Sequence, residues 1–274
     1  AHPGDPDNRS GTESAVTTNQ NQGDSVGYII LAVLVTFVEV WMGFQGRQAL
    51  QGSNMSSVGT TGELAGFNLD FWQLPDEPLL GFVEIPAGVF LMGSNPAVDR
   101  QAYENERWSQ AVRQGSVELP DFFIARYEVT VAQYREFVRD TARAAVPETL
   151  AAESDHPVTN ITWTDALAYA RWLQDRLLQH TDTPAELKSL LEAGWQVSLP
   201  TEAQWEKAAR GTDGNIYPWG IQLLQERANF AAAATQPVGS FNCPECNFGL
   251  ADMSGNVWEL TRSPYQSYPY STED

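Results

Sequence analysis

The most continuous apolar stretch of the chain lies near its N-terminus. Residues Val26–Phe44 form a run of nineteen residues with a single charge, at Glu39. A helix of about 20 mostly apolar residues is long enough to cross a bilayer. The summed transfer free energy of the apolar residues also outweighs the cost of one carboxylate. The pattern therefore predicts one transmembrane helix, over residues 26–46, in contact with the lipid bilayer.

The segments on either side of this run are polar. Residues 1–25 are rich in Gly, Asn, Ser and Thr and show no hydrophobic periodicity, which is typical of a disordered tail. Residues 47–80 mix small polar residues with isolated large apolar ones, and we expect a linker that packs on the domain near its end. The tail is acidic, unlike the start of a secretory signal peptide. We therefore expect a retained, single-pass anchor.

Glu39 is the one charged residue of the predicted helix. Two interpretations stay open: the carboxylate lies near the interface or is protonated in lipid, or it contacts a neighbouring membrane subunit. Arg9 and Arg47 flank the helix and nearly balance the positive-inside count, so the sequence does not fix the orientation. As a working expectation, the soluble domain lies on the periplasmic or extracytoplasmic side and other membrane-protein subunits are its partners.

From Gly81 onward the pattern changes to short strands and capped helices. Residues 81–94 alternate apolar residues around a Pro-Ala-Gly sequence, which predicts two short strands joined by a tight turn. Residues 117–130 predict further β structure. These strands and the helices that follow indicate an α+β domain over residues 81–274, with long loops after the last helix.

Three helices are predicted in this domain. The first begins at Thr130, because Gln133 gives it the spacing of a capping box. The second follows Trp163, where apolar residues recur at helical spacing. The third has the same Thr-x-x-Gln cap, starting at Thr201, and ends at Gly211.

Composition and charge limit the classes of function that the chain can have. The chain has 35 acidic and 16 basic residues and a net charge of −19. Such a surface repels nucleic acid and anionic lipid headgroups, so we expect no nucleic-acid partner. Only two cysteines occur, Cys243 and Cys246, so a hydrophobic core rather than a disulfide framework must hold the domain together.

Seven sequence blocks carry a resemblance to a known family. In chain order they are FVEIPAGVFLMGS, FFIARYEVTVAQYREFV, HPVTNITWTDALAYARWL, LPTEAQWEKAARG, YPWG, PVGSF and NFGLADMSGNVWEL. In this order they resemble the formylglycine-generating-enzyme, or sulfatase-modifying factor, family over roughly residues 81–262. The resemblance implies a C-type-lectin-like α+β fold with little regular secondary structure.

The chain departs from the family pattern where catalysis is decided. Active members carry, after the GNVWE block, an RGGSW-like segment and a later pair of cysteines that hold copper and activate oxygen. Neither follows here before Asp274, and Cys243 and Cys246 lie upstream in a different loop. We therefore expect that these residues bind no copper. The pair is interpreted as a local disulfide or as two free thiols, with a metal site shared with another chain as the alternative.

The resemblance also implies candidate calcium ligands. Asn256 and Glu259 of the GNVWE block form one candidate site, and Asn229 with the carbonyl of Phe230 forms another, since oxygen ligands suit a hard cation. The competing interpretation is that Asn256 stabilises a tight turn and Glu259 pairs locally. Other notable side chains are expected to be structural, the tryptophans as core residues: His156, Glu202, Glu206, Trp163, Trp205, Trp219 and Trp258.

Two classes of function remain. The first is a non-catalytic, membrane-anchored accessory or binding subunit that uses the domain as an interaction surface. The second is an oxygen-dependent formylglycine-generating-type oxidase that acts on a cysteine of a client protein, with its catalytic segment outside this sequence. Because function depends on the site and not on the fold, the unmatched catalytic segment favours the first.

Overall fold

The computed structural model describes residues 64–103, 106, 108, 114–241 and 243–270 with their side chains, and the backbone of Tyr28–Ile30 and Val33–Leu34. The predicted tail, Glu39 and most of the predicted membrane helix lie outside the described residues. Among the helices that are described, none is long and apolar enough to cross a membrane.

Short strands build four small sheets. The strands are β1 (Tyr28–Ile30), β2 (Val33–Leu34), β3 (Phe67–Asn68), β4 (Leu74–Pro75), β5 (Phe82–Ile85), β6 (Gly88–Met92), β7 (Gly115–Leu119), β8 (Phe122–Ala125), β9 (Gln196–Ser198) and β10 (Glu259–Leu260). The largest sheet has the order β5-β8-β1-β9, in which β5 is antiparallel to β8, and β1 runs parallel to both β8 and β9. The other three sheets of the described residues are the antiparallel pairs β6-β7, β3-β4 and β2-β10.

Four α-helices accompany the strands: α1 (Val131–Thr141), α2 (Trp163–Gln179), α3 (Ala185–Glu192) and α4 (Glu202–Arg210). The predicted capping boxes are present at Thr130 and Thr201, where each Thr side chain accepts a hydrogen bond from the backbone of a Gln that bonds back. Helix α2 begins at Trp163, as expected, and α4 ends at Gly211. Helix α3 was not predicted from the sequence.

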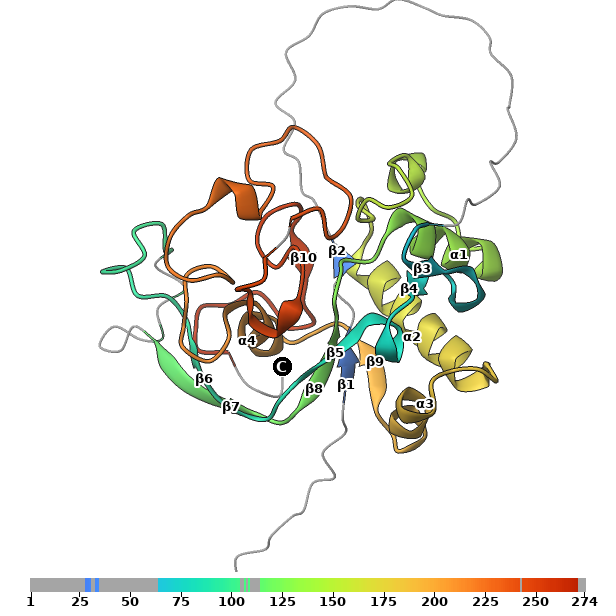
Figure 1. The fold of residues 1–274 in the computed structure, drawn as a ribbon, viewed down its shortest axis with the longest axis horizontal. Helices are drawn as coiled ribbons and strands as arrows, with labels where there is room; N and C mark the ends of the chain where they lie inside the picture. The colour runs from blue at the N-terminus through green and yellow to red at the C-terminus, as the bar shows by residue number, and fades with distance from the viewer. Residues whose placement is uncertain are drawn as a thin grey trace, which may run out of the picture.

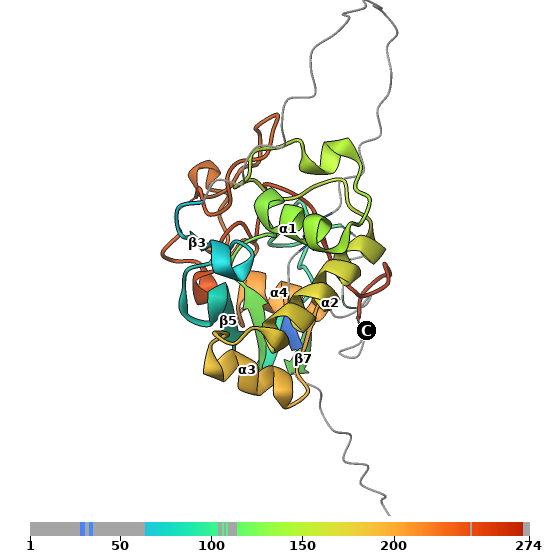
Figure 2. The same cartoon turned by 90° about the vertical axis from the view of Figure 1, so that its right-hand side faces the viewer.

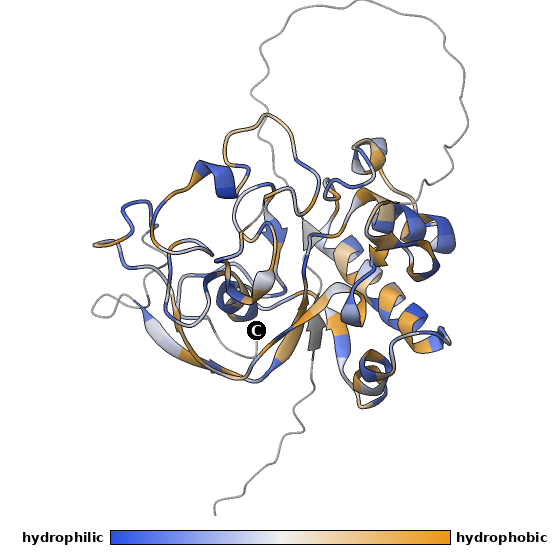
Figure 3. Cartoon of the chain, viewed as in Figure 1, coloured by the Kyte–Doolittle hydropathy of each residue, from blue (hydrophilic) through white to orange (hydrophobic). Residues whose placement is uncertain are grey.

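The central strand β8 separates two hydrophobic cores. Phe123 belongs to the core formed with α1, α2 and α3, whereas Phe122 and Ile124 belong to the core formed with β6, β7 and α4. This follows from the strand, in which successive side chains point to opposite faces. Figure 1 shows α1, α2 and α3 on one side of β8, and α4, β6, β7 and the long C-terminal loops on the other. Figure 2 shows the three helices from their own side, and Figure 3 shows apolar and polar residues alternating around these helices.

Two expectations need correction or extension. The strands predicted in residues 81–94 exist, but β5 and β6 do not pair with each other: β5 pairs with β8, and β6 with β7. Residues 64–80, assigned to the linker from the sequence, form β3, β4 and turns whose Phe71, Leu74 and Leu80 are buried in the core. The α+β class, with little regular secondary structure, is confirmed.

Candidate functional site

A groove runs between α4 and the chain segment around β10. Two hollows, of about 510 and 1,090 Å³, share residues from both walls and form this one groove. One wall is the face of α4 that carries Glu202, Trp205 and Arg210. The opposite wall carries Trp258, Glu259 and Thr261. Residues one helical turn apart share a face, which is why a single helix supplies one whole wall.

Hydrogen bonds across the groove hold the walls together. The indole N–H of Trp205 donates to Glu259 Oε2 at 2.8 Å, and the Thr261 hydroxyl donates to Glu202 Oε2 at 3.1 Å. The indole N–H of Trp163 donates to the carbonyl of Thr261 at 3.1 Å. In each of the carboxylates of Glu202 and Glu259, only Oε2 accepts a hydrogen bond from the described residues. The other oxygens are therefore available to a ligand.

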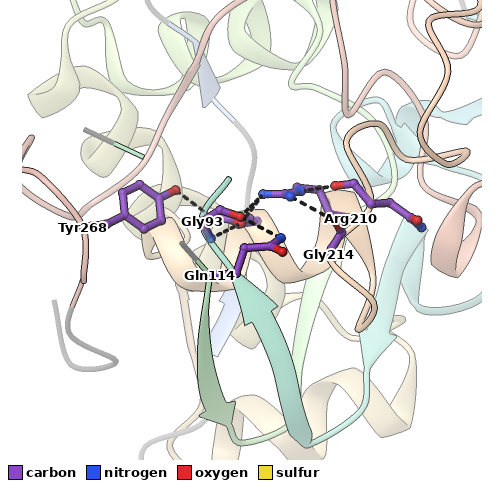
Figure 4. A network of polar contacts seen from close by, with 7 residues as sticks. Gly93, Gln114, Arg210, Gly214 and Tyr268 are labelled. Atoms are coloured by element: carbon purple, nitrogen blue, oxygen red, sulfur yellow. Dashed lines mark hydrogen bonds and ion pairs between the residues drawn. The ribbon is translucent and has the colours of Figure 1, made fainter. Parts of the chain in front are cut away.

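A polar network closes one end of the groove (Figure 4). Glu206 accepts hydrogen bonds from the backbone N–H of Gly93 at 2.8 Å and from the hydroxyl of Tyr268 at 2.6 Å, and it pairs with Arg210. Arg210 also donates to carbonyls of neighbouring loops, including Gly93 at 3.2 Å and Gly214 at 3.3 Å. Glu206 and Arg210 are thus mutually satisfied structural groups, and the network fixes the C-terminal segment against α4.

Three carboxylates that line the groove or lie behind it, those of Glu259, Asp252 and Glu128, carry raised pKa values. Burial raises the pKa of Glu259 to about 7, with the nearby charge of Asp252 adding to the shift and the Trp205 N–H opposing it. Burial also raises the pKa of Asp252, and it raises that of Glu128 well above its ordinary value, helped by the charges of Asp252 and Glu259. None of these three pairs with a basic side chain among the described ion pairs. Carboxylate oxygens are ligands that suit a hard cation, but the raised pKa values show that the surroundings favour the neutral acids.

The predicted calcium ligands are not all free to bind an ion. Asn256 adopts a left-handed conformation, with φ of 59°, and its Oδ1 accepts a hydrogen bond from the N–H of Gln236 at 2.9 Å and another from Asn229. Its Nδ2 donates to the buried Glu128 at 3.1 Å. The described residues contain no group of three or more His, Cys, Asp or Glu side chains arranged to hold a metal. Asn256 therefore stabilises the turn, and Glu259 with Asp252 offers the more accessible carboxylate oxygens.

The second candidate pair lies beside this turn. Asn229 accepts the N–H of Asn256 on its backbone carbonyl at 3.0 Å, and its side chain bonds to Ala232 and Ala234. Phe230 is 40% exposed and lies beside the stacked rings of Tyr217 and Trp219. The structure thus brings Asn229 and Asn256 together through local hydrogen bonds and leaves Glu259 apart, bonded to Trp205.

Sequence reasoning missed two acids and misplaced two tryptophans. Glu128 and Asp252 carried no local signal, because only the fold brings them near Glu259. Trp163 and Trp258 were expected in the core, but they are 44% and 77% exposed. Trp258 precedes β10 and lines both hollows of the groove beside Glu259, where its indole meets solvent.

The two cysteines are bonded to each other. Cys243 and Cys246 close a small loop in which the N–H of Cys246 donates to the carbonyl of Cys243 at 3.1 Å. Glu245 between them pairs with Arg227 at 2.5 Å. His156 contacts the hydroxyl of Thr235 at 2.8 Å and so joins two loops.

The fold and the groove define an α+β domain in which one helix and long loops, rather than a sheet edge, form the candidate binding surface. The chain belongs to the sulfatase-modifying factor family: the family described as "Sulfatase-modifying factor enzyme 1-like domain" matches residues 70–273.

Three curated relatives show the range of this family. An uncharacterised Bacillus subtilis protein, YfmG, is 28% identical over 232 residues, 67% of this chain and 42% of that protein. The formylglycine-generating enzyme of Thermomonospora curvata is 28% identical over 261 residues, covering 73% of this chain and 76% of the enzyme. The "Inactive C-alpha-formylglycine-generating enzyme 2" of the mouse is 28% identical over 221 residues, 67% of this chain and 69% of that protein. Relatives named as an enzyme and as an inactive enzyme thus have the same identity to this chain. The chain spans less than half the length of YfmG.

Proposed function

We propose that this domain is a non-catalytic binding module that holds an extended segment of a partner protein in the groove between α4 and β10. The observation that carries the proposal is the rim of the groove, where large aromatic side chains are exposed. Trp258 is 77% exposed, Tyr265 89% and Tyr103 67%. Aromatic side chains of this kind supply much of the binding free energy at protein interfaces.

Charge supports a cationic group on the ligand. Five carboxylates, those of Asp99, Glu106, Glu202, Glu206 and Glu259, line the larger hollow, against two guanidinium groups. Glu202 and Glu259 each keep one oxygen free of hydrogen bonds from the described residues. An arginine or lysine side chain of the partner would pair with these oxygens and lie against the indole faces.

The disulfide also supports binding rather than cysteine-based oxidation. Monovalent copper is selected by soft thiolate ligands, and in this chain both sulfur atoms are bonded to each other.

Three further proposals rest on the sequence: a single-pass anchor over residues 26–46, contact of Glu39 with membrane-protein subunits, and an extracytoplasmic placement of the domain. The lectin-like arrangement implied by the resemblance is likewise consistent with a binding role.

The test measures peptide capture by the full chain. A library of short peptides with a fixed arginine is compared with the same library carrying glutamine at that position. We expect enrichment of the arginine library and a loss of about tenfold in affinity for Trp258→Ala and for Glu202→Gln, since anchor residues contribute more than about 1 kcal/mol each. Val89→Ala and Glu84→Gln serve as controls, because both residues are exposed and lie outside the groove. Equal capture of the two libraries, or equal losses in the control variants, would reject the proposal.

A second function is favoured by the relatives named as formylglycine-generating enzymes. Such an activity would convert a peptide cysteine to formylglycine in the presence of copper and oxygen. We expect no such mass change with this protein, and Cys243→Ser combined with Cys246→Ser is expected to change only stability. A formylglycine product that disappears in the double variant would establish an oxidase instead.

A further inference from the structure

The disulfide between Cys243 and Cys246 lies at the surface of the domain. Pro244 and Glu245, the residues between the two cysteines, are exposed, and both cysteines are half-buried. Neither cysteine is among the described residues of the two hydrophobic cores. A reductant can therefore approach the bond from solvent without entering a core.

The bond also closes a very short loop. Its cysteines are separated by 3 positions in the sequence. The stabilisation that a disulfide provides grows with the number of residues in the loop that it closes. A loop this short adds little to the stability of the whole domain, so we expect both cores to stay folded when the bond is broken.

An ion pair attaches this loop to a second one. Glu245 pairs with Arg227 at 2.5 Å, and their side chains are 37% and 24% exposed. Arg227 ends a short 3-10 helix (Gln225–Arg227) and precedes the buried Ala228. An ion pair at the surface is weak when both long side chains must be ordered to form it. Because the disulfide restricts the positions open to Glu245, it favours the pair.

The residue after the disulfide is held in a different way. The side-chain amide of Asn247 donates to the carbonyl of Pro218 at 3.4 Å. Asn247 also packs closely on Gly211, where a Cβ atom would lie 2.6 Å from its amide nitrogen. These contacts do not involve sulfur. Breaking the bond should therefore free residues 243–245 and leave the segment that follows in place.

We propose that Cys243 and Cys246 form a thiol–disulfide exchange site for a dithiol partner, and that reduction of this site releases Glu245 from Arg227. A thiolate of the partner attacks one sulfur of the pair, a mixed disulfide forms, and the other cysteine leaves as a thiolate that takes up a proton. The second thiol of the partner loses its proton and attacks the mixed disulfide, which frees the remaining cysteine for protonation. The chain gains two electrons and two protons, and the partner is oxidised to a disulfide. The site does not depend on the groove or its ligand.

Reduction of the full chain under native conditions tests the site. Dithiothreitol serves as the dithiol, free thiols are alkylated with iodoacetamide, and mass spectrometry counts them. We expect both cysteines to be alkylated while the protein stays folded. Trypsin should then cleave after Arg227 several-fold faster than in the oxidised protein, because proteolysis of a folded chain reports local opening.

Arg143 provides the internal control in the same digest, because it pairs with Asp165 at 2.5 Å in the helical half. Cleavage after Arg143 should not change on reduction.

Two variants separate the bond from the ion pair. Cys243→Ser combined with Cys246→Ser should show the fast cleavage after Arg227 with and without dithiothreitol. Glu245→Gln keeps the disulfide but removes the charge, so it should show fast cleavage already in the oxidised protein. Alkylation only after unfolding, an unchanged rate after Arg227 on reduction, or an equal acceleration after Arg143 would each overturn the proposal.

Discussion

The half of the domain built from α1, α2 and α3 packs four aromatic rings against one another and buries the charged Glu136, whereas α4 in the groove half buries two adjacent charged residues, Glu206 and Lys207. In the helical half, Tyr134, Phe137, Tyr169 and Trp172 form ring contacts with centroids 5.3 to 5.9 Å apart. In the groove half, Glu206 and Glu128 are 3% and 2% exposed. Burying apolar rings stabilises a fold without specific partners, but a buried carboxylate must find a hydrogen bond or a cation.

This difference indicates that the helical half mainly stabilises the fold, whereas the groove half has the polar groups that can bind a ligand. The helical half can tolerate changes at its surface, because its stabilisation is distributed over many small contacts. The groove half has its own apolar core around Phe90 and Phe122, but the walls of its groove are joined by a few polar contacts between segments that are distant in sequence. A ligand or cation that satisfies the remaining carboxylate oxygens would stabilise that half selectively.

The largest expected effect is in the helical core. Leu173→Ala removes a fully buried side chain of α2 and should lower the free energy of unfolding by about 2 to 5 kcal/mol. Urea denaturation measures the change, with Arg171→Ala in the same helix as the exposed control. A loss below about 1 kcal/mol would show that the helical half does not depend on its core in this way.

The second effect is the pH dependence of the groove half. The pKa of Glu259 is raised to about 7 in the folded state, so folding favours its protonated form. The resulting stabilisation is complete below the unfolded pKa of about 4.3 and is lost as the pH rises through about 7, by at most about 4 kcal/mol. Glu259→Gln should remove most of this dependence, as judged from melting temperatures between pH 5 and pH 8.

The same melting experiment can be repeated with added calcium. An ion that binds only the folded carboxylates should raise the melting temperature, most strongly at pH 8 where they are charged. Chelation should reverse the shift, and Glu259→Gln should abolish it while Glu84→Gln retains it. Identical melting curves with calcium and with chelator would limit the role of these acids to structure.

A third effect tests the network of Figure 4. Tyr268→Phe removes the hydroxyl that donates to Glu206 at 2.6 Å, and hydrogen bonds to charged groups contribute about 1.5 to 3 kcal/mol. We expect a loss in this range together with weaker peptide binding, because Tyr268 holds the C-terminal segment that lines the groove. The melting temperature from calorimetry and the peptide affinity from the binding assay should therefore fall together. Lost stability with unchanged binding would separate the network from the site.

The smallest expected effect concerns two helix capping boxes, one from each half of the domain. Thr130→Ala and Thr201→Ala each remove a capping box and should lower the free energy of unfolding by about 1 kcal/mol. Because the two caps have the same local geometry, the losses should agree within a few tenths of a kcal/mol. A much larger loss at Thr201 would indicate that α4 is held mainly by its N-terminus.

These caps also mark how far sequence reasoning reached. Capping boxes at Thr130 and Thr201 are local patterns of four residues, and they predicted helix starts correctly. The pairing of β5 with β8 depends on residues some 40 positions apart, so the short-range pattern of residues 81–94 could not show it. The carboxylates of Glu128 and Asp252 are separated by 124 positions (252 minus 128), and no local spacing links them. The exposure of Trp258 follows from its place in the groove, which only the folded chain forms.

The alternation of β8 has a consequence for how the domain unfolds. Phe122 and Ile124 belong to one core and Phe123 to the other, so the backbone of one strand is the shared wall of both. When either core unfolds, the face of β8 that packed against it becomes exposed to water, and the strand no longer holds the other core in place. The two halves should therefore lose their structure in a single cooperative transition, with equal calorimetric and van't Hoff enthalpies.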